Sequence, residues 1–112
     1  MKLTRKPTAQ ELRLIELLVE KASINLSSNW RNKLIVQSMD DGQMGNLRLC
    51  PEGDVAKKRL FDKCVSEYQF YDVDGITVVA SLYVDNENKL FELDIWKTNY
   101  EPLKNIYLDE TF

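Results

Sequence analysis

The sequence contains no histidine among its 112 residues. Histidine is the commonest general base and a frequent metal ligand, so its absence removes the usual centre of acid–base and metal-dependent catalysis. The chain also lacks a glycine-rich phosphate loop and a Gly-x-Ser-x-Gly nucleophile elbow, and neither cysteine has a histidine to activate it. We therefore expect no catalytic residue, no cofactor and no bound metal.

Cysteines and long apolar runs are also scarce. The two cysteines, Cys50 and Cys64, fall in different predicted strands and form no Cys-x-x-Cys pair, which favours buried free thiols over a disulfide or a reactive thiol. No segment approaches the roughly 18 apolar residues of a membrane span, and no apolar run follows the positively charged N-terminal residues. We expect a cytoplasmic protein that does not contact a membrane.

A length of 112 residues is that of one ordinary domain, so residues 1–112 are expected to share one core. Charge is uneven along it, because residues 1–58 hold ten Lys/Arg and seven Asp/Glu, whereas residues 59–112 hold five and eleven. An acidic second half suits a basic partner, although solvated strand faces and acidic turns give the same imbalance. The basic cluster Lys57 to Arg59 has no interleaved aromatic residues, so it predicts a solvated loop rather than a nucleic-acid site.

The periodicity of apolar residues predicts an α+β fold. Thr8 and Glu11 form a capping box that begins a helix. The apolar stripe of this helix, which would cover a sheet, consists of Leu12, Ile15, Val19 and Ala22, with Leu18 beside them. Strands are expected at residues 34–40, 44–50, 63–71, 76–84 and 89–97, the first two as a hairpin and the last three as a meander. The expected architecture is an N-terminal helix packed on an antiparallel sheet of about five strands.

The last of these strands, residues 89–97, alternates apolar and polar residues along its whole length. Strict alternation places Phe91, Leu93 and Ile95 on a buried face and Glu92, Asp94 and Trp96 on the opposite face. The apolar C-terminal segment, residues 99–112, is expected to pack along the sheet edge. Trp96 then lies either under this segment, which we favour, or on an exposed binding face. Glu92 and Asp94 would then be available to a partner, to water, or to a substrate as an acid–base pair.

A second acidic feature is the turn Asp72-Val73-Asp74-Gly75. It matches the beginning of a calcium loop, but the third oxygen ligand before the glycine and the glutamate at the twelfth position are absent, so calcium binding is not favoured. We therefore assign the two aspartates to the acidic surface. The predicted partner-binding residues are Asp72, Asp74, Glu92, Asp94 and Trp96.

Four short segments occur together in the order Asp-Asp-Gly-Gln-Met-Gly-Asn-Leu (residues 40–47), Asp74-Gly75, Leu-Phe-Glu-Leu-Asp-Ile-Trp-Lys (residues 90–97) and Pro102-Leu103. This set resembles a family of small bacterial proteins, without an established activity, that carry an Asp-Gly-Gly-Met-Gly-Ser-Leu-like motif and a later Leu-Phe-Glu-Leu-Asp-Ile-Trp-Lys motif. Gln43 and Asn46 depart from the first motif, which usually has glycine and serine there. The resemblance implies one domain and supplies no catalytic residue.

Small acidic proteins of this kind are often immunity proteins encoded beside polymorphic or contact-dependent growth-inhibition toxins, so the resemblance implies that function by analogy. The expected partner is a basic toxin domain, such as a nuclease, that the protein binds and blocks. No nucleic-acid or membrane partner is expected, and the protein would be a monomer or a weak dimer. Two alternatives remain open: a small carboxylate-dependent hydrolase using Glu92 and Asp94, and a non-catalytic interaction module that joins a larger assembly through an exposed sheet edge.

Overall fold

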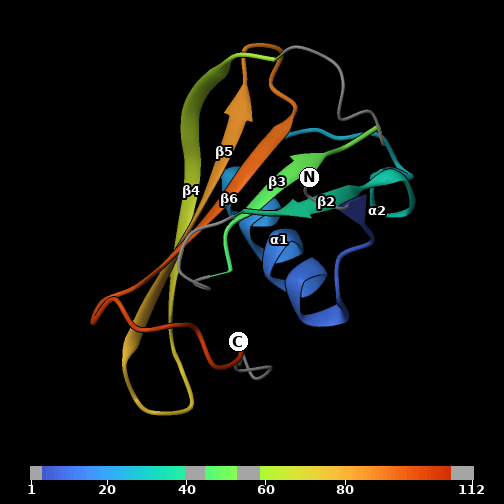
Figure 1. The fold of residues 1–112 in the computed structure, drawn as a ribbon. Helices are drawn as coiled ribbons and strands as arrows, with labels where there is room; N and C mark the ends of the chain where they lie inside the picture. Colours follow the sequence, from blue (N-terminus) through green and yellow to red (C-terminus); the bar gives the residue numbers. More distant parts are fainter. Residues whose placement is uncertain (1–3, 40–44, 53–58, 107–112) are drawn as a thin grey trace.

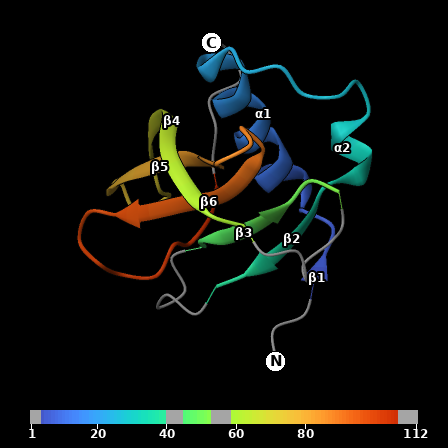
Figure 2. The same cartoon turned by 90° about the horizontal axis from the view of Figure 1, so that it is seen from above.

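The computed structural model describes residues 4–39, 45–52 and 59–106, which form one antiparallel six-stranded sheet with helices on one side (Figures 1 and 2). The helices are α1 (Ala9–Ala22) and the single turn α2 (Trp30–Lys33). The strands are β1 (Thr4–Arg5), β2 (Ile35–Ser38), β3 (Leu47–Cys50), β4 (Phe61–Tyr71), β5 (Thr77–Asp85) and β6 (Leu90–Lys97), in the spatial order β1-β2-β3-β6-β5-β4. The predicted α+β class is confirmed.

Helix α1 begins at the predicted capping box. The Thr8 hydroxyl accepts a hydrogen bond from the Glu11 amide at 3.1 Å, and the Glu11 carboxylate accepts one from the Thr8 amide at 2.9 Å. Both bonds satisfy amides that the first helical turn leaves without a partner. The helix ends at Ser23, whose left-handed backbone (φ 56°) terminates the helical hydrogen bonding.

The core lies between α1 and the sheet. Three residues of α1 are completely buried, namely Leu14, Ile15 and Leu18. They pack against the inward residues of the sheet, which include Leu47 and Leu49 of β3, Val78, Ala80 and Leu82 of β5, and Leu90, Leu93 and Ile95 of β6. Burying each such leucine or isoleucine contributes about 1.5 to 3 kcal/mol. The predicted stripe of α1 included Ile15 and Leu18, whose burial is confirmed, and Leu12 and Val19, which are only partly buried, but it omitted Leu14.

The strand pairing contains the predicted hairpin and meander, joined through β6. Strands β2 and β3 form the hairpin, and β4, β5 and β6 form the meander. Leu47 and Arg48 of β3 pair with Leu93 and Glu92 of β6, which places β6 inside the sheet. The turn between the two predicted strands of the hairpin, residues 41–43, lies outside the described residues. The same is true of most of residues 55–61, which the sequence predicts as an exposed loop or a short helix. Strand β1 was missed because a two-residue strand has no detectable alternation.

A β-bulge in β6 changes the predicted faces of that strand. Val84 pairs with Leu90 and Tyr83 pairs with Glu92, so Phe91 is an extra residue in β6. A bulge interrupts strict alternation. Phe91 is therefore not part of the core cluster, and its ring instead lies 5.0 Å from the guanidinium carbon of Arg48. The predicted burial of Phe91 is confirmed, since it is only 8% exposed, but the prediction that it shares a face with Leu93 and Ile95 is wrong.

Two further sequence predictions are corrected by burial. Cys50 and Cys64 are both free, but only Cys50 is buried, whereas Cys64 is exposed. Arg59 is not solvated, because its side chain is only 11% exposed and its Nε donates to Asp85 Oδ2 at 2.9 Å. Lys57 and Lys58 lie outside the described residues. Over the described part of the chain, neither helix has the length and apolar character needed to cross a membrane.

Candidate functional site

The side of the sheet that faces away from α1, here called the outer face, is built by the residues that alternate with the core residues of β4, β5 and β6. Residues paired directly across antiparallel strands point to the same face. Pairing therefore defines three rows on this face: Cys64–Tyr83–Glu92–Arg48, Glu67–Ser81–Asp94 and Gln69–Val79–Trp96. The structure thus brings together Glu92, Asp94 and Trp96 of the predicted site.

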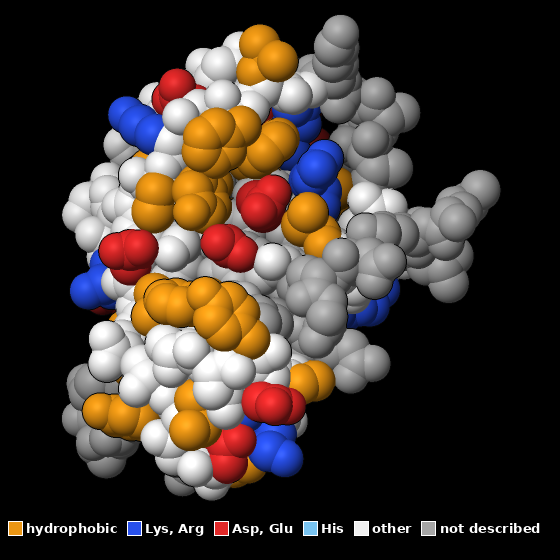
Figure 3. Space-filling model, turned by 60° about the vertical axis from the view of Figure 1, so that its left-hand side comes forward, with side chains coloured by type: hydrophobic (Ala, Val, Ile, Leu, Met, Phe, Trp, Pro, Cys, Tyr) orange, Lys and Arg blue, Asp and Glu red, His pale blue; other side chains and the backbone are white. Residues whose placement is uncertain are grey.

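Three carboxylates, those of Glu67, Glu92 and Asp94, occupy the centre of the outer face. The Ser81 hydroxyl donates a hydrogen bond to Glu67 Oε2 at 3.1 Å. Glu92 and Asp94 are partly buried, and neither makes a hydrogen bond or an ion pair with any other described residue. Figure 3 shows acidic side chains of this kind lying between two groups of hydrophobic side chains. The centre of the face therefore carries incompletely neutralised negative charge.

The pKa values of Glu92 and Tyr83 are raised by burial and by the incompletely neutralised negative charge on this face. Burial raises the pKa of Glu92, the nearby Asp94 carboxylate raises it further, and the positive charge of Arg48 opposes this only in part. Burial also raises the pKa of Tyr83, and the charge of Asp94 adds to the effect. A cation brought to this surface would reverse these unfavourable interactions, because an opposite charge stabilises the ionised carboxylate.

Aromatic side chains flank the carboxylates at both ends of the outer face. At one end the Phe61 ring lies 5.2 Å from the Tyr83 ring and 6.2 Å from the Phe91 ring, measured between centroids. At the other end the Trp96 and Tyr100 rings are 6.0 Å apart. Phe61 is 57% exposed, Trp96 42% and Tyr100 73%. Large aromatic surfaces of this kind remain available for contact with another molecule.

The expectation that the C-terminal segment covers Trp96 is wrong for its described part. Leu103 and Ile106 pack against the core cluster on the other side of the sheet. Of the described C-terminal residues, Tyr100 makes a ring contact with Trp96. Tyr107, which was also expected to contribute, lies outside the described residues.

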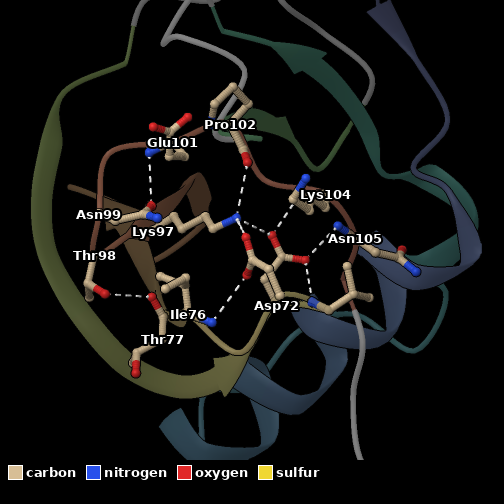
Figure 4. A network of polar contacts seen from close by, with 12 residues as sticks. Asp72, Ile76, Thr77, Lys97, Thr98, Asn99, Glu101, Pro102, Lys104 and Asn105 are labelled. Carbon is tan, nitrogen blue, oxygen red and sulfur yellow. Dashed lines mark hydrogen bonds and ion pairs between the residues drawn. The ribbon is translucent and has the colours of Figure 1, made fainter.

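Asp72 and Asp74 do not join the outer face. Lys97, the last residue of β6, is completely buried, and its Nζ lies 2.9 Å from Asp72 Oδ2 and 2.6 Å from Asp74 Oδ2 (Figure 4). The Asp72 carboxylate also accepts hydrogen bonds from the Lys104 amide at 2.7 Å and the Asn105 amide at 3.1 Å. The Asp72 side chain is 0% exposed. The prediction that Asp72 binds a partner is therefore wrong, because this carboxylate is enclosed by its own chain.

The charges of this network stabilise one another. Burial alone would raise the pKa of Asp72, but hydrogen bonds from the Lys104 amide and from Lys97 outweigh it and hold the pKa below its ordinary value. The hydrogen bond from Lys97 is the main cause that lowers the pKa of Asp74. Burial opposes the charge on Lys97, yet its bonds to both aspartates leave its pKa raised. Asp74 is an exposed turn residue that keeps 29% side-chain exposure, so the expectation that it binds a partner stays a prediction.

Sequence reasoning missed several residues of the outer face, notably Glu67, Tyr83 and Phe61. A bulge at Val65 explains the first omission, because Cys64 pairs with Tyr83 and Ser66 pairs with Leu82. Cys64 and Glu67 consequently share a face although they are three positions apart, which a strict period of two forbids. Tyr83 could have been predicted on the outer face. The apolar residues alternate from Ile76 to Val84, and this pattern directs the residues between them, including Tyr83, outward.

Among its described residues, the outer face has no metal-ligating cluster, and three pockets of the molecule do not include Glu92 or Asp94. Within the described residues there is no group of three or more Cys, Asp and Glu side chains that could hold a metal ion. Three pockets lined by described residues lie beside α1, at the bulge of β4 and around Arg59, and the lining of these three includes neither Glu92 nor Asp94. The carboxylates instead lie on an open sheet surface.

Residues 4–107 match the family model described as a domain of unknown function, DUF6984. No curated protein and no solved structure matches the chain.

Proposed function

The chain belongs to the DUF6984 family, and we propose that it is a toxin-neutralising immunity protein whose outer face binds and blocks a basic toxin domain. The observation that carries the proposal is the acidic centre of that face, where Glu92 and Asp94 make no ion pair with a described residue and the positive charge of Arg48 offsets that of Glu92 only in part. A surface that holds such charge between exposed aromatic residues is complementary to a basic surface with apolar neighbours.

The two components of the face would serve different purposes in binding. The carboxylates would attract the basic domain over a distance and speed association, with a rate that falls as salt screens the charges. The exposed rings of Phe61, Trp96 and Tyr100 would supply contact area, because interface energy is concentrated in a few aromatic and arginine residues. Binding over the active site of a nuclease would block it without any chemistry by this protein.

A carboxylate-dependent hydrolase is the second candidate, and one observation favours it. The pKa of Glu92 is raised beside the Asp94 carboxylate, as in pairs where one acid donates and the other accepts a proton. This reading predicts that Glu92→Gln and Asp94→Asn each abolish turnover of a sugar, phosphoester or nucleic-acid substrate. It has no support if the purified protein turns over none of these substrate classes.

The deciding experiment uses the toxin domain encoded next to the gene of this chain as the binding partner. Isothermal titration would compare the native protein with the Glu92→Lys/Asp94→Lys double variant, which reverses two charges at the centre of the face. We expect the double variant to lose at least about 100-fold in affinity, the scale of a strong interface residue, and the native affinity to weaken with added salt.

The matched control is Glu20→Lys, because Glu20 is exposed near the end of α1 and lies away from the outer face. This variant changes the net charge in the same direction and should bind with nearly native affinity. Loss of binding in Glu20→Lys alone, or full binding by the folded double variant, would refute the assignment of the outer face. A neighbouring gene that encodes a metabolic enzyme would count against the immunity function itself.

A further inference from the structure

Strand β4 forms one edge of the sheet and has a long row of main-chain groups without a partner among the described residues. It spans Phe61–Tyr71, whereas the opposite edge, β1, has only two residues. Bulges interrupt β4 at Asp62 and Val65, but its register with β5 is continuous from Ser66 to Tyr71. Natural proteins usually protect such edges with bulges, prolines or lysines. The regular part of β4 contains none of these, and Glu67 is its only charged residue.

The turn that follows β4 shows which residues of this strand direct their amides and carbonyls away from β5. The Asp72 amide donates to the Ile76 carbonyl at 2.9 Å, so the main-chain groups of Asp72 point toward β5. Because this orientation alternates along a strand, Ser66, Tyr68 and Phe70 also point toward β5. Glu67, Gln69 and Tyr71 then direct their amides and carbonyls outward. Their side chains are exposed, with Tyr71 at 61%, and no described residue pairs with their outward main-chain groups.

We propose that β4 pairs with β4 of a second copy of this chain, antiparallel and about a two-fold axis through Gln69. In this register Gln69 faces its own symmetry mate, and Glu67 faces Tyr71 of the second copy. Each of these opposed pairs has its amide and carbonyl directed outward, so each exchanges two hydrogen bonds. Moving the axis by one residue in either direction would place one outward residue opposite the bulge at Val65 or beyond the strand end at Tyr71.

The charges of the edge are compatible with self-association in this register. Glu67 meets the hydroxyl-bearing side chain of Tyr71 instead of another carboxylate, and no like charges lie directly opposite one another within Ser66 to Tyr71. An axis through Glu67 would instead bring two carboxylates together, which is unfavourable. The register with its axis through Gln69 therefore keeps like charges apart and also pairs the outward amides and carbonyls of Glu67, Gln69 and Tyr71.

The pairing would also join the two outer faces. The row Gln69–Val79–Trp96 would continue across the axis into the same row of the second copy. On this continuous surface, Glu67 of each copy would lie beside Tyr71 of the other copy. This arrangement does not depend on the proposed toxin, so it can be tested on the purified chain alone.

The test is sedimentation equilibrium over a wide range of protein concentrations, with variants at Gln69. Gln69→Pro removes the outward amide without removing a bond to β5, and proline is tolerated at such edge positions. Gln69→Thr is the matched control, because it keeps the amide. We expect a reversible dimer for the native protein and for Gln69→Thr, and a folded monomer for Gln69→Pro. A native chain that stays monomeric at every concentration overturns the proposal.

Two further measurements keep the result decisive if Gln69→Pro folds poorly. Gln69→Lys places like charges at the axis and should weaken the dimer by up to about fivefold, with recovery in high salt. Amide exchange should slow with increasing concentration at Glu67, Gln69 and Tyr71, the amides directed outward. A dimer that persists in folded Gln69→Pro, or exchange at these amides that does not respond to concentration, shows that the copies meet elsewhere or not at all.

Discussion

Lys97 Nζ lies 2.9 Å from Asp72 Oδ2, and both side chains are 0% exposed. Lys97 ends β6, whereas Asp72 follows β4 and accepts hydrogen bonds from the amides of Lys104 and Asn105. One buried ion pair therefore connects the β4–β5 turn, the end of β6 and the C-terminal segment. Removing Lys97 would leave the buried Asp72 carboxylate without an opposite charge, and removing Asp72 would take from Lys97 the buried member of its two carboxylate partners.

The first prediction concerns the stability that depends on Asp72. Asp72→Ala leaves Lys97 with only Asp74 as a carboxylate partner and leaves the Lys104 and Asn105 amides without their acceptor. We expect the free energy of unfolding to fall by about 3 to 5 kcal/mol, the usual cost of breaking a buried ion pair. Urea denaturation monitored by tryptophan fluorescence measures this change. Asp62→Ala, an exposed position in β4, should change it by less than about 0.5 kcal/mol.

The second prediction is a loss of stability in acid. The pKa values of Asp72, Asp74 and Asp85 are lowered in the folded chain, so the unfolded chain takes up protons first as the pH falls. Their contribution is complete above the ordinary aspartate pKa of about 4 and disappears as the pH drops through the lower folded-state values. Unfolding free energies measured from about pH 6 to pH 2 should decline below about pH 4. A flat profile over that interval would contradict the assigned network.

The same argument has the opposite sign for Lys97. Its pKa is raised above 10.5 in the folded chain, so its contribution is complete below that value and is lost as the pH rises through the folded-state pKa. Stability should therefore decline again in strong alkali. Asp72→Asn should reduce the acid-dependent change, because it removes one of the carboxylates that titrate.

The third prediction distinguishes a buried arginine from an exposed one. Arg59 donates to Asp85, to the Leu49 carbonyl at 2.7 Å and to the Leu90 carbonyl from separate nitrogens of one guanidinium. A lysine ammonium cannot reproduce this fork. We expect Arg59→Lys to cost about 2 kcal/mol of unfolding free energy, the scale of a lost charged hydrogen bond.

Arg48→Lys is the control for Arg59→Lys, because the guanidinium carbons of both arginines lie close to the Phe91 ring, at 5.0 Å for Arg48 and 5.1 Å for Arg59. Arg48 is exposed, so its replacement should cost less than about 0.5 kcal/mol. Thermal melts of the two variants provide the comparison. Equal losses in both would show that contact with Phe91, rather than the hydrogen-bonding fork, determines the effect.

The fold was predictable from sequence where a pattern is local. The capping box at Thr8 and the alternation from Ile76 to Val84 each follow from neighbouring residues, and both are confirmed. The pairing of β3 with β6 was not predictable, because it joins residues about 45 positions apart without a local signal. The bulges at Val65 and Phe91 were also missed, since an extra residue changes the face of a strand without changing its composition.

The candidate site was predictable only in part for the same reason. Glu92, Asp94 and Trp96 follow one another in a regular part of β6, so alternation alone placed them on one face. Asp72 was misassigned because its sequence context is that of an exposed acidic turn. The sequence predicts its buried partner, Lys97, as the polar last residue of a strand. Only the tertiary structure brings the two side chains together.

The last prediction tests whether Trp96 is a binding residue or a structural one. Trp96 is 42% exposed on the outer face and contacts Tyr100, whereas the other tryptophan, Trp30, is only 7% exposed. Trp96→Ala should therefore reduce the free energy of unfolding by only about 1 to 2 kcal/mol. It should reduce the binding free energy for the toxin domain encoded beside this chain by about 2 kcal/mol or more, because aromatic anchors dominate interfaces. Thermal melts and isothermal titration measure the two quantities separately.

Trp30→Ala is the control for Trp96→Ala, because it removes the same side chain from a buried position on the helical side of the sheet. It should cost about 3 to 5 kcal/mol of stability, with nearly native affinity in whatever fraction remains folded. Trp96→Ala is thus expected to lose mainly binding affinity, whereas Trp30→Ala is expected to lose mainly stability. A large drop in melting temperature for Trp96→Ala with unchanged affinity would show that Trp96 supports the fold and that the outer face is not anchored there.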